Sequence, residues 1–327
     1  MNLFTNPSKF FSLLSTLYSL LCLLLTGCSF NPYHTESRLL MGTIVEITCQ
    51  DRSAIGAAFE EIKRIEKIAN KFDTASEISL LNEKGEIKAS EDLLNLVRES
   101  LNIYRLSEGA FDITINPVAS IWKEEIKKAD SKKSEVALPA AEEIREKLSL
   151  VGSDKIVIDE TQSLIKFIQP GVSIDLGGIA KGYAVDAAVK RLKELGITSA
   201  LVNAGGNIYC MGRKNNRKWH IGIQDPRRPQ KISYYLDLEN QGAATSGDYQ
   251  QFFVSAGKRY SHIIDPKTGY PVDNGIISVT IIAPNAALAD GLSTAVFVLG
   301  IEKGIALVKK LGNNIGAKII EEGEIKP

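Results

Sequence analysis

The sequence lacks the residues on which nitrogen- and sulfur-bound metal sites depend. Its 327 residues include only three histidines, and His34 lies in the short stretch that precedes the expected domain, which leaves His220 and His262. A three-histidine metal site is therefore excluded. The chain has no Cys-x-x-Cys pair, no His-Glu-x-x-His motif and no serine within a Gly-x-Ser-x-Gly elbow. These absences argue against zinc chemistry and simple serine hydrolysis.

An excess of charge is absent too, and cysteine is scarce. The 39 basic and 39 acidic residues balance to a net charge of zero, so nothing indicates a nucleic-acid partner. Of four cysteines, Cys22 falls in a segment that we expect to be removed and Cys28 is expected to carry lipid. Cys49 and Cys210 remain, and they form either a disulfide outside the cytoplasm or two separate buried thiols.

The N-terminus is typical of a lipoprotein signal peptide. Lys9 precedes an apolar run over 10–25, and small residues then lead to Cys28. The alternative is a transmembrane helix, but the run is short for a span of ~20 residues and contains serines and threonines. Ser29 after the cysteine favours the outer membrane in a cell that has two membranes.

These features divide the chain into three parts. We expect a signal peptide over 1–27, a lipidated tether over 28–37 and one folded domain over 38–327. The protein would then be a bacterial lipoprotein anchored to the membrane and facing the periplasm or another extracytoplasmic side.

Hydrophobic periodicity predicts an α+β fold. Residues 41–48 alternate as a half-buried strand, and apolar residues over 54–72 repeat at helical spacing. The charge-rich stretch 123–139 predicts a solvated loop. Because strands come in runs and helices cluster, we expect a single domain with mixed β-sheets and packed helices. Further strands are expected at 155–159, 164–168, 199–203, 207–211, 219–224, 233–238, 260–264, 277–283 and 317–321, and further helices at 93–104, 139–150, 183–195, 287–299 and 302–311.

A glycine-rich segment over 173–182 is the most informative stretch of the chain. A short apolar strand that carries Asp175 runs into a Gly177-Gly178 turn, and Lys181 then opens a helix. Glycines let a backbone approach a ligand closely, and the amides at a helix start attract phosphate oxygens. The segment matches neither the Walker A loop nor the three-glycine dinucleotide fingerprint. Alone it is a weak signal.

Oxygen-donor chemistry remains possible near the C-terminus. Asp290 and Thr294 stand four residues apart on a predicted helix, so both oxygens face the same way. With a carbonyl from a glycine turn they would suit Mg²⁺, which prefers oxygen ligands. The alternative is local: Asp290 assists the first helical turn and Thr294 bonds back to a carbonyl.

His262 ends a predicted strand and precedes the tight turn 265–269. Its imidazole suits proton transfer or a contact to phosphate oxygens, and a buried structural histidine is an equal alternative. The hydroxyls of 245–246 are a further weak phosphate signal, and the second Gly-Gly turn, 203–207, is typical of a hairpin.

Taken in order, these motifs resemble the FAD:protein FMN transferase family, also known as ApbE-type lipoproteins. The likeness spans nearly the whole mature chain. It is carried by Met41-Gly42-Thr43, 109–114 with Asn116-Pro117, 175–182, 203–207, 245–247, 262–266 and 290–295.

The resemblance implies a Mg²⁺-dependent transfer: FAD is cleaved at its pyrophosphate, FMN is joined by a phosphoester bond to a Thr or Ser of a target flavoprotein, and AMP leaves. We expect Asp290 and His262 to be the catalytic residues, with either one taking the proton from the acceptor hydroxyl. Two sequence departures are Gly291, where the family often has Ala, and the charged insertion 123–135. The alternatives are an FAD pyrophosphatase that forms FMN and AMP, an FAD-binding lipoprotein, and a lipoprotein without chemistry. By resemblance, FAD would contact Met41, Phe72, Ala110, Phe111, Asp112, Asp175, Lys181, His262, Ile263 and Ile264, and Mg²⁺ would be held by the carbonyl of Gly178 with Asp290 and Thr294.

Overall fold

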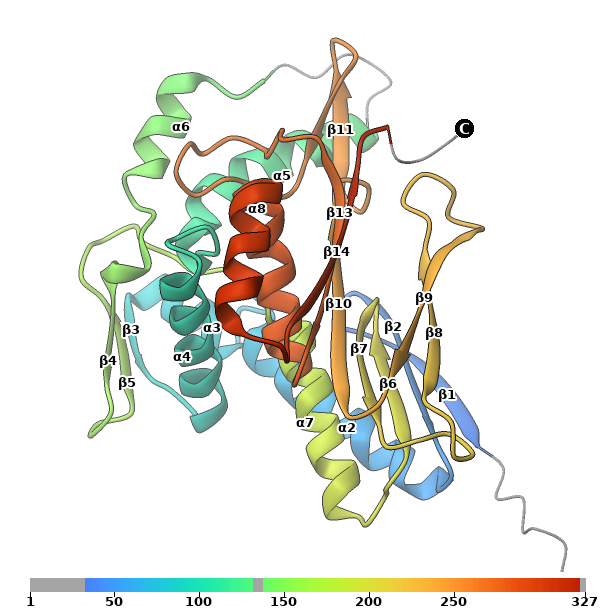
Figure 1. The fold of residues 1–327 in the computed structure, drawn as a ribbon. Helices are drawn as coiled ribbons and strands as arrows, with labels where there is room; N and C mark the ends of the chain where they lie inside the picture. The colour runs from blue at the N-terminus through green and yellow to red at the C-terminus, as the bar shows by residue number, and fades with distance from the viewer. Residues whose placement is uncertain (1–32, 132–137, 324–327) are drawn as a thin grey trace, which may run out of the picture. The chain divides into compact units, whose positions relative to one another are not determined.

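The structure, a computed structural model, describes residues 33–131 and 138–323 (Figure 1). The expected signal peptide and Cys28 lie outside these residues. The folded domain begins with β1 at His34, so the expected tether over 28–37 ends too late: residues 34–37 pair with 46–49 of the next strand. Within this stretch the half-buried His34 and Glu36 alternate with the exposed Thr35 and Ser37, as side chains of a strand do.

A seven-stranded sheet forms the centre of the domain, and each pair of neighbouring strands is antiparallel. The α+β class is confirmed, and the other strand pairs of the described ranges are antiparallel too. The strand order is β1 (His34–Leu40), β2 (Thr43–Cys49), β6 (Ala200–Ala204), β7 (Asn207–Met211), β10 (Gln241–Gly247), β13 (Ile276–Ala283) and β14 (Gly316–Glu321).

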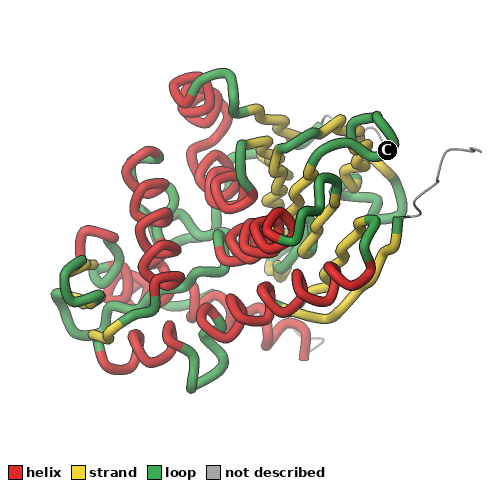
Figure 2. The backbone as a smooth tube through the Cα atoms, turned by 90° about the horizontal axis from the view of Figure 1, so that it is seen from below, coloured by secondary structure: helices red, strands yellow, loops and turns green. Residues whose placement is uncertain are grey.

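Helices cover one side of this sheet, as Figures 1 and 2 show. Their apolar faces form two cores, one beneath β2 and β6 and one beneath β10 and β13. The predicted helices at 287–299 and 302–311 are one long helix interrupted at Gly300, whose φ of 81° is not helical. The helices that cover the sheet are α2 (Arg52–Ala69), α7 (Ala180–Glu194) and α8 (Ala286–Leu311), and α8 is the interrupted one.

Within the described ranges, α8 is the one helix long and apolar enough to meet the length and composition of a membrane span. Half of its most apolar window is buried inside the domain, and Leu292, Val296 and Phe297 belong to the core. The hydrophobicity of α8 is thus accounted for by its position as a core helix.

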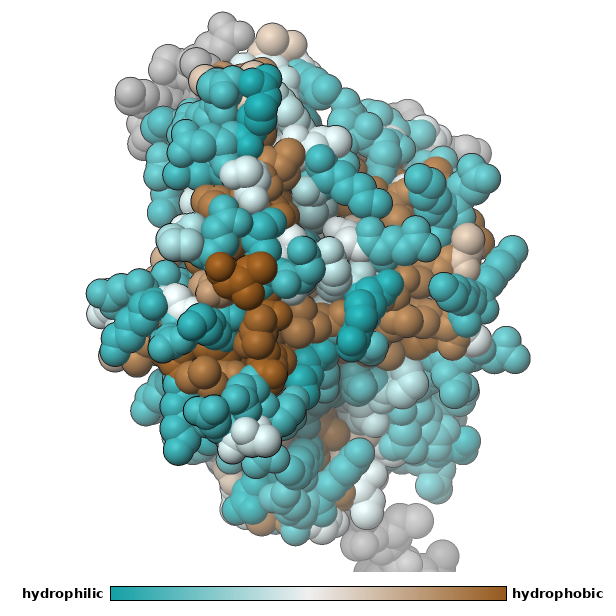
Figure 3. Space-filling view, turned by 90° about the vertical axis from the view of Figure 1, so that its left-hand side faces the viewer, coloured by the Kyte–Doolittle hydropathy of each residue, from teal (hydrophilic) through white to brown (hydrophobic). Residues whose placement is uncertain are grey.

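The remaining elements flank the central layers. Figure 3 faces the side that carries β4 and β5 and shows hydrophobic side chains gathered between hydrophilic margins; Val157 of β4 and Ile168 after β5 are 46% and 61% exposed. The flanking elements are α3 (Glu77–Lys84), β3 (Glu86–Lys88), α4 (Glu91–Leu106), α5 (Asn116–Ser131), α6 (Ala141–Leu148), β4 (Ile156–Asp159), β5 (Leu164–Phe167), β8 (Trp219–Gln224), β9 (Ile232–Leu238), β11 (Phe252–Ser255) and β12 (Lys258–Ser261).

The loop predicted over 123–139 is wrong in its first part, because α5 continues to Ser131. Val118, Trp122 and Ile126 recur every fourth residue and are buried, so the charges of this stretch occupy the other faces of a helix. The Trp122 indole N–H donates to the carbonyl of Gly269 at 2.8 Å, which fixes α5 against the turn that follows β12.

Candidate active site

A pocket of about 980 Å³ opens between segments that lie far apart in the sequence. This volume is at the upper end of the range for ligand sites and suits a long ligand. Its walls come from the β1–β2 turn, the end of α2, the loop before α5, the Gly-Gly loop before α7, β10 and the first turns of α8. All thirteen residues that the resemblance assigned to FAD or metal line it: Met41, Phe72, Ala110, Phe111, Asp112, Asp175, Gly178, Lys181, His262, Ile263, Ile264, Asp290 and Thr294.

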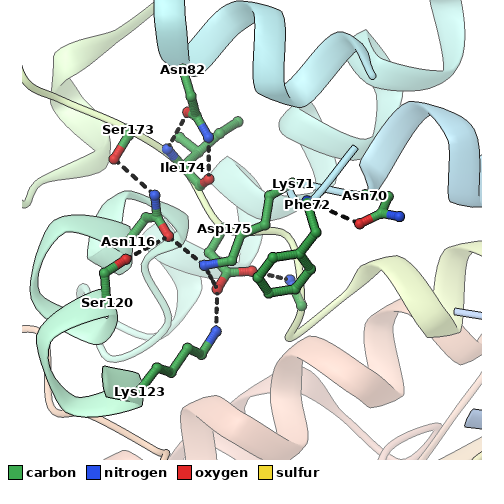
Figure 4. Close-up of polar contacts among 11 residues, drawn as sticks. Asn70, Lys71, Phe72, Asn82, Asn116, Ser120, Lys123, Ser173, Ile174 and Asp175 are labelled. Atoms are coloured by element: carbon green, nitrogen blue, oxygen red, sulfur yellow. Dashed lines mark hydrogen bonds and ion pairs between the residues drawn. The ribbon is translucent and has the colours of Figure 1, made fainter. Parts of the chain in front are cut away.

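Asp175 stands at the start of the Gly-Gly loop, and two lysines bind it (Figure 4). Its Oδ2 accepts from Lys71 Nζ at 2.9 Å and from Lys123 Nζ at 2.7 Å, and its Oδ1 accepts from the N–H of Gly177 at 2.9 Å. Burial alone would raise the pKa of this carboxyl, but the two ammonium groups prevail and hold the pKa of Asp175 well below its usual range. Asp175 is therefore an anion whose oxygens are already occupied by the protein.

Side-chain amides hold this arrangement in place (Figure 4). Asn116 at the start of α5 accepts from Lys71 Nζ at 2.6 Å and donates to Ser173 Oγ at 2.9 Å. Asn82 of α3 binds both the N–H and the carbonyl of Ile174, at 2.7 and 2.9 Å. The prediction of a strand that carries Asp175 is wrong, since no strand lies among the described residues between β5 and α7; hydrogen bonds with these side-chain amides hold the segment in place instead.

The predicted metal ligands meet where the Gly-Gly loop, β10 and α8 converge. Asp290 is buried and accepts on Oδ2 from the N–H of Gly182 at 3.0 Å. Thr294 Oγ1 lies 3.2 Å from Ser246 Oγ, and a Cβ built on Gly178 would lie 3.6 Å from Thr294 Oγ1. Burial raises the pKa of the Asp290 carboxyl, against the opposing effects of Lys181 and the Gly182 amide.

The local alternatives for this pair do not hold. Asn285 is the N-cap of α8 and accepts from the N–H of Leu288 at 2.8 Å, so Asp290 is not needed there. The Thr294 hydroxyl contacts another hydroxyl, that of Ser246. Both side chains are directed to tertiary neighbours and to the pocket.

The geometry of His262 fixes its tautomer. Nδ1 lies 3.1 Å from the carbonyl oxygen of Gln251, and because a carbonyl only accepts, Nδ1 carries the proton and Nε2 has a free lone pair. Burial is the largest influence and lowers the pKa of His262 to about 4; the hydrogen bond to Gln251 opposes this effect, and Lys123 and Lys181 make smaller contributions that lower the pKa further. The imidazole is therefore neutral and able to accept a proton at neutral pH.

The other predicted contacts differ in how free their side chains are. The Asp112 carboxylate accepts four hydrogen bonds, two from Thr114 and two from Ser153, so it shapes the loop that lines the pocket. Phe72 is 76% exposed at the rim. Lys181 Nζ donates to the carbonyl of Gly177 at 3.0 Å.

Sequence reasoning missed Lys71 and Lys123, which also line the pocket. Lys71 precedes Phe72 but belongs to no recognisable motif, and Lys123 was predicted to lie in the solvated loop 123–139. The one signal was helical spacing, since Lys123 stands four residues after Ala119, which also faces the pocket. The structure answers the cysteine question as well: Cys49 and Cys210 are separate buried thiols.

Comparison with known proteins identifies the family. Residues 41–319 match the model of the ApbE family, and the chain belongs to that family. It is 35% identical to the FAD:protein FMN transferase of Haemophilus influenzae over 86% of this chain and 84% of that protein. It is 30% identical to a protein of the same name from Klebsiella pneumoniae over 86% and 87% of the two chains.

Solved structures show the same fold. The ApbE protein of Thermotoga maritima superposes with a TM-score of 0.79 at 33% identity and covers 89% of this chain and 95% of its own. The flavin transferase ApbE of Vibrio cholerae gives a TM-score of 0.78 at 28% identity, over 90% and 94% of the two chains.

Proposed function

We propose that this chain is an FAD:protein FMN transferase. It would cleave FAD at its pyrophosphate, join FMN through a phosphoester bond to a Thr or Ser hydroxyl of an acceptor flavoprotein, and release AMP. The names of the relatives support this activity. The observation that carries it is one pocket in which a buried carboxylate, a hydroxyl and a neutral histidine stand beside a Gly-Gly loop.

The oxygen set at the start of α8 fits Mg²⁺. Among the residues that the structure describes, no three His, Cys, Asp or Glu side chains come together as a metal cluster. A cation here would therefore use one carboxylate, Asp290, with the hydroxyl of Thr294 and the carbonyl of Gly178, and all three are oxygens. Asp290 Oδ2 accepts a hydrogen bond from the N–H of Gly182, and this bond orients the carboxylate. When bound, Mg²⁺ would neutralise the pyrophosphate and stabilise the charge that develops on AMP.

His262 is the better candidate for the general base. The acceptor hydroxyl must lose its proton as its oxygen bonds to the phosphorus of the FMN half and the bond from that phosphorus to the AMP oxygen breaks. His262 Nε2 is free to accept this proton because Nδ1 is engaged by Gln251. As a metal ligand, Asp290 would have its negative charge compensated by the cation and would be the weaker base. Lys181 would contact phosphate oxygens. The amides of Ala180 and Gly182 at the start of α7 already donate to Leu176 and Asp290, so they do not supply this contact.

The decisive experiment measures flavin fluorescence on an acceptor flavoprotein after denaturing electrophoresis. We expect Asp290→Ala to lower the transfer rate on the order of 100-fold or more, and Thr294→Ala, which removes a neutral ligand, to have a smaller effect. Asp237→Ala removes an exposed carboxylate on β9 and serves as the matched control. Undiminished transfer by Asp290→Ala, or by the parent in excess EDTA, would refute the metal-assisted mechanism.

Incubation with FAD in the absence of an acceptor protein tests the two alternative functions. Release of FMN and AMP from FAD without an acceptor protein indicates a pyrophosphatase. Tight FAD binding without turnover indicates an FAD-binding lipoprotein.

We also propose that the domain is a bacterial lipoprotein tethered through a diacylated Cys28 on the periplasmic or another extracytoplasmic side of the membrane. The proposal is supported by the apolar run and the small residues before the cysteine. Cys28→Ser should abolish incorporation of labelled fatty acid, and labelling that persists in this variant would contradict it.

A further inference from the structure

The lysine pair on Asp175 leaves one positive charge uncompensated at the wall of the pocket. Lys71 and Lys123 bring two ammonium groups to a single carboxylate, within 2.9 and 2.7 Å. The side chains are only 13% and 29% exposed, so solvent offers the extra charge little compensation. Both lysines line the pocket. A buried excess charge of this kind is stabilised by an anion from a ligand.

The ammonium groups also retain unused donors. Each carries three N–H groups. Lys71 Nζ gives one to Asp175 and one to Asn116, and Lys123 Nζ gives one to Asp175. In the described part of the chain, one N–H of Lys71 and two of Lys123 therefore have no hydrogen-bond partner at the pocket wall, although the Lys71 ammonium also lies 5.6 Å from the centre of the Phe72 ring.

The pair adjoins the reaction centre. Asp175 opens the loop whose Gly178 faces Thr294, and its Oδ1 holds the intervening amide of Gly177. Lys123 also lies near enough to His262 to lower its pKa. The lysine pair and the proposed metal ligands thus border one Gly-Gly loop.

We propose that Lys71 and Lys123, positioned by Asp175 and Asn116, bind an anionic phosphate oxygen of the FAD pyrophosphate. The inference rests on the proposed function. The pyrophosphate carries negative charge on both phosphates, and one cation site at Asp290 and Thr294 together with the lysine pair would contact it from two directions. Asp175 then acts as a positioning residue, because its oxygens are bound by the lysines and by Gly177.

The competing interpretation is that the lysines only neutralise Asp175. To separate the two, FAD affinity is measured by flavin fluorescence for the parent, Lys71→Gln, Lys123→Gln and the double variant. AMP and adenosine are compared as competitors of FAD, since they differ only in the phosphate. Lys190→Gln, an exposed lysine on α7, controls for net charge.

We expect each pocket substitution to weaken FAD and AMP about tenfold, the order of one charge-assisted hydrogen bond, and to leave adenosine unchanged. Lys→Arg variants should recover part of the loss because they keep the charge. Equal weakening of AMP and adenosine, unchanged FAD affinity, or a loss confined to the KM for the acceptor protein would overturn the proposal.

Removing both lysines strands a buried carboxylate, so the double variant could fail to fold. The triple variant with Asp175→Asn removes all three charges, and comparison with Asp175→Asn alone leaves the lysines as the only difference. The triple variant should bind FAD at least tenfold more weakly. If the parent itself fails to bind FAD, the proposed function fails and this inference with it. If the parent binds FAD and the variants bind it equally, only this inference fails.

Discussion

Gly182 is the position where adding one methyl group should do most harm to the site. Gly182 lies in the first turn of α7, where this helix crosses the start of α8. A Cβ there would lie 2.3 Å from the carbonyl oxygen of Ala286 and 2.8 Å from the Cα of Ala287, both well inside the 3.4 Å at which ordinary contact begins. Because the atoms in the way are backbone, the two helices must separate.

The energetic cost follows from that separation. Overpacking a dense core costs about 1–3 kcal/mol, and replacing glycine by alanine in a helix returns at most about 1 kcal/mol. We expect Gly182→Ala to lower the free energy of unfolding by about 1–2 kcal/mol. It should also raise the Mg²⁺ concentration for half-maximal transfer, because the Gly182 amide that orients Asp290 at 3.0 Å moves with the helix.

Gly291→Ala is the matched control, since it also adds one methyl group to a buried helical glycine. Its Cβ would meet Ile103 Cδ1 at 2.4 Å, but this atom is the tip of a flexible side chain and the other Ile103 atoms are 3.6 Å away. The gain in helix propensity should offset the adjustment, so the unfolding free energy should change by less than about 1 kcal/mol. Urea unfolding and Mg²⁺ titration of both variants test the reasoning. Equal stability and equal Mg²⁺ dependence would refute the claim that the α7–α8 contact sets Asp290.

Four further predictions concern His262, Asp112 and the two cysteines. His262→Gln should lower the transfer rate about 100-fold or more. In the parent, the transfer rate should fall on the acid side near pH 4 instead of pH 6.5, because burial keeps the imidazole neutral down to about pH 4. A fall near pH 6.5 would contradict the burial argument. The same lowered pKa means that the unfolded chain binds the proton first, so the unfolding free energy should decline as pH falls from about 6.5 towards 4, as urea titrations at several pH values can show. Asp112→Asn should cost about 1–3 kcal/mol, measured by thermal unfolding, because the amide nitrogen that replaces Oδ2 cannot accept from the buried N–H of Ser153, while the remaining oxygen keeps the other three hydrogen bonds. Reducing agent should leave the melting temperature unchanged, since Cys49 and Cys210 are free thiols, and a drop would reveal a disulfide.

Local patterns predicted most of the elements, and their failures have local causes. The helices α2, α4 and α7 follow from apolar spacing near 3.6 residues, and β13 from a run of β-branched residues. β10 was missed because its sequence, Gln241–Gly247, consists mostly of small residues without alternation. The second half of α5 was predicted to be a loop because its many charged residues outnumber the apolar residues that form its buried face.

The candidate site, too, was predicted in part from the sequence and in part seen only in the structure. The order of short motifs carried the likeness to the ApbE family, which the match over 41–319 confirms. The thirteen residues that this resemblance assigned to FAD or metal all line the pocket. From the residues alone, the glycine turns and the spacing of Asp290 and Thr294 were the local features that pointed to a site.

Only the tertiary structure decided which charges line the pocket. Lys123 lies 52 residues from Asp175, and Lys71 lies farther still along the chain. A lysine carries no sequence signal of its partner, since an ion pair depends on where distant segments meet and not on local periodicity. The sequence alone thus determined the elements, the motifs and the family. The packing of α2, α5 and the Gly-Gly loop against one another brought two lysines to one carboxylate, because only a folded chain fixes such distances.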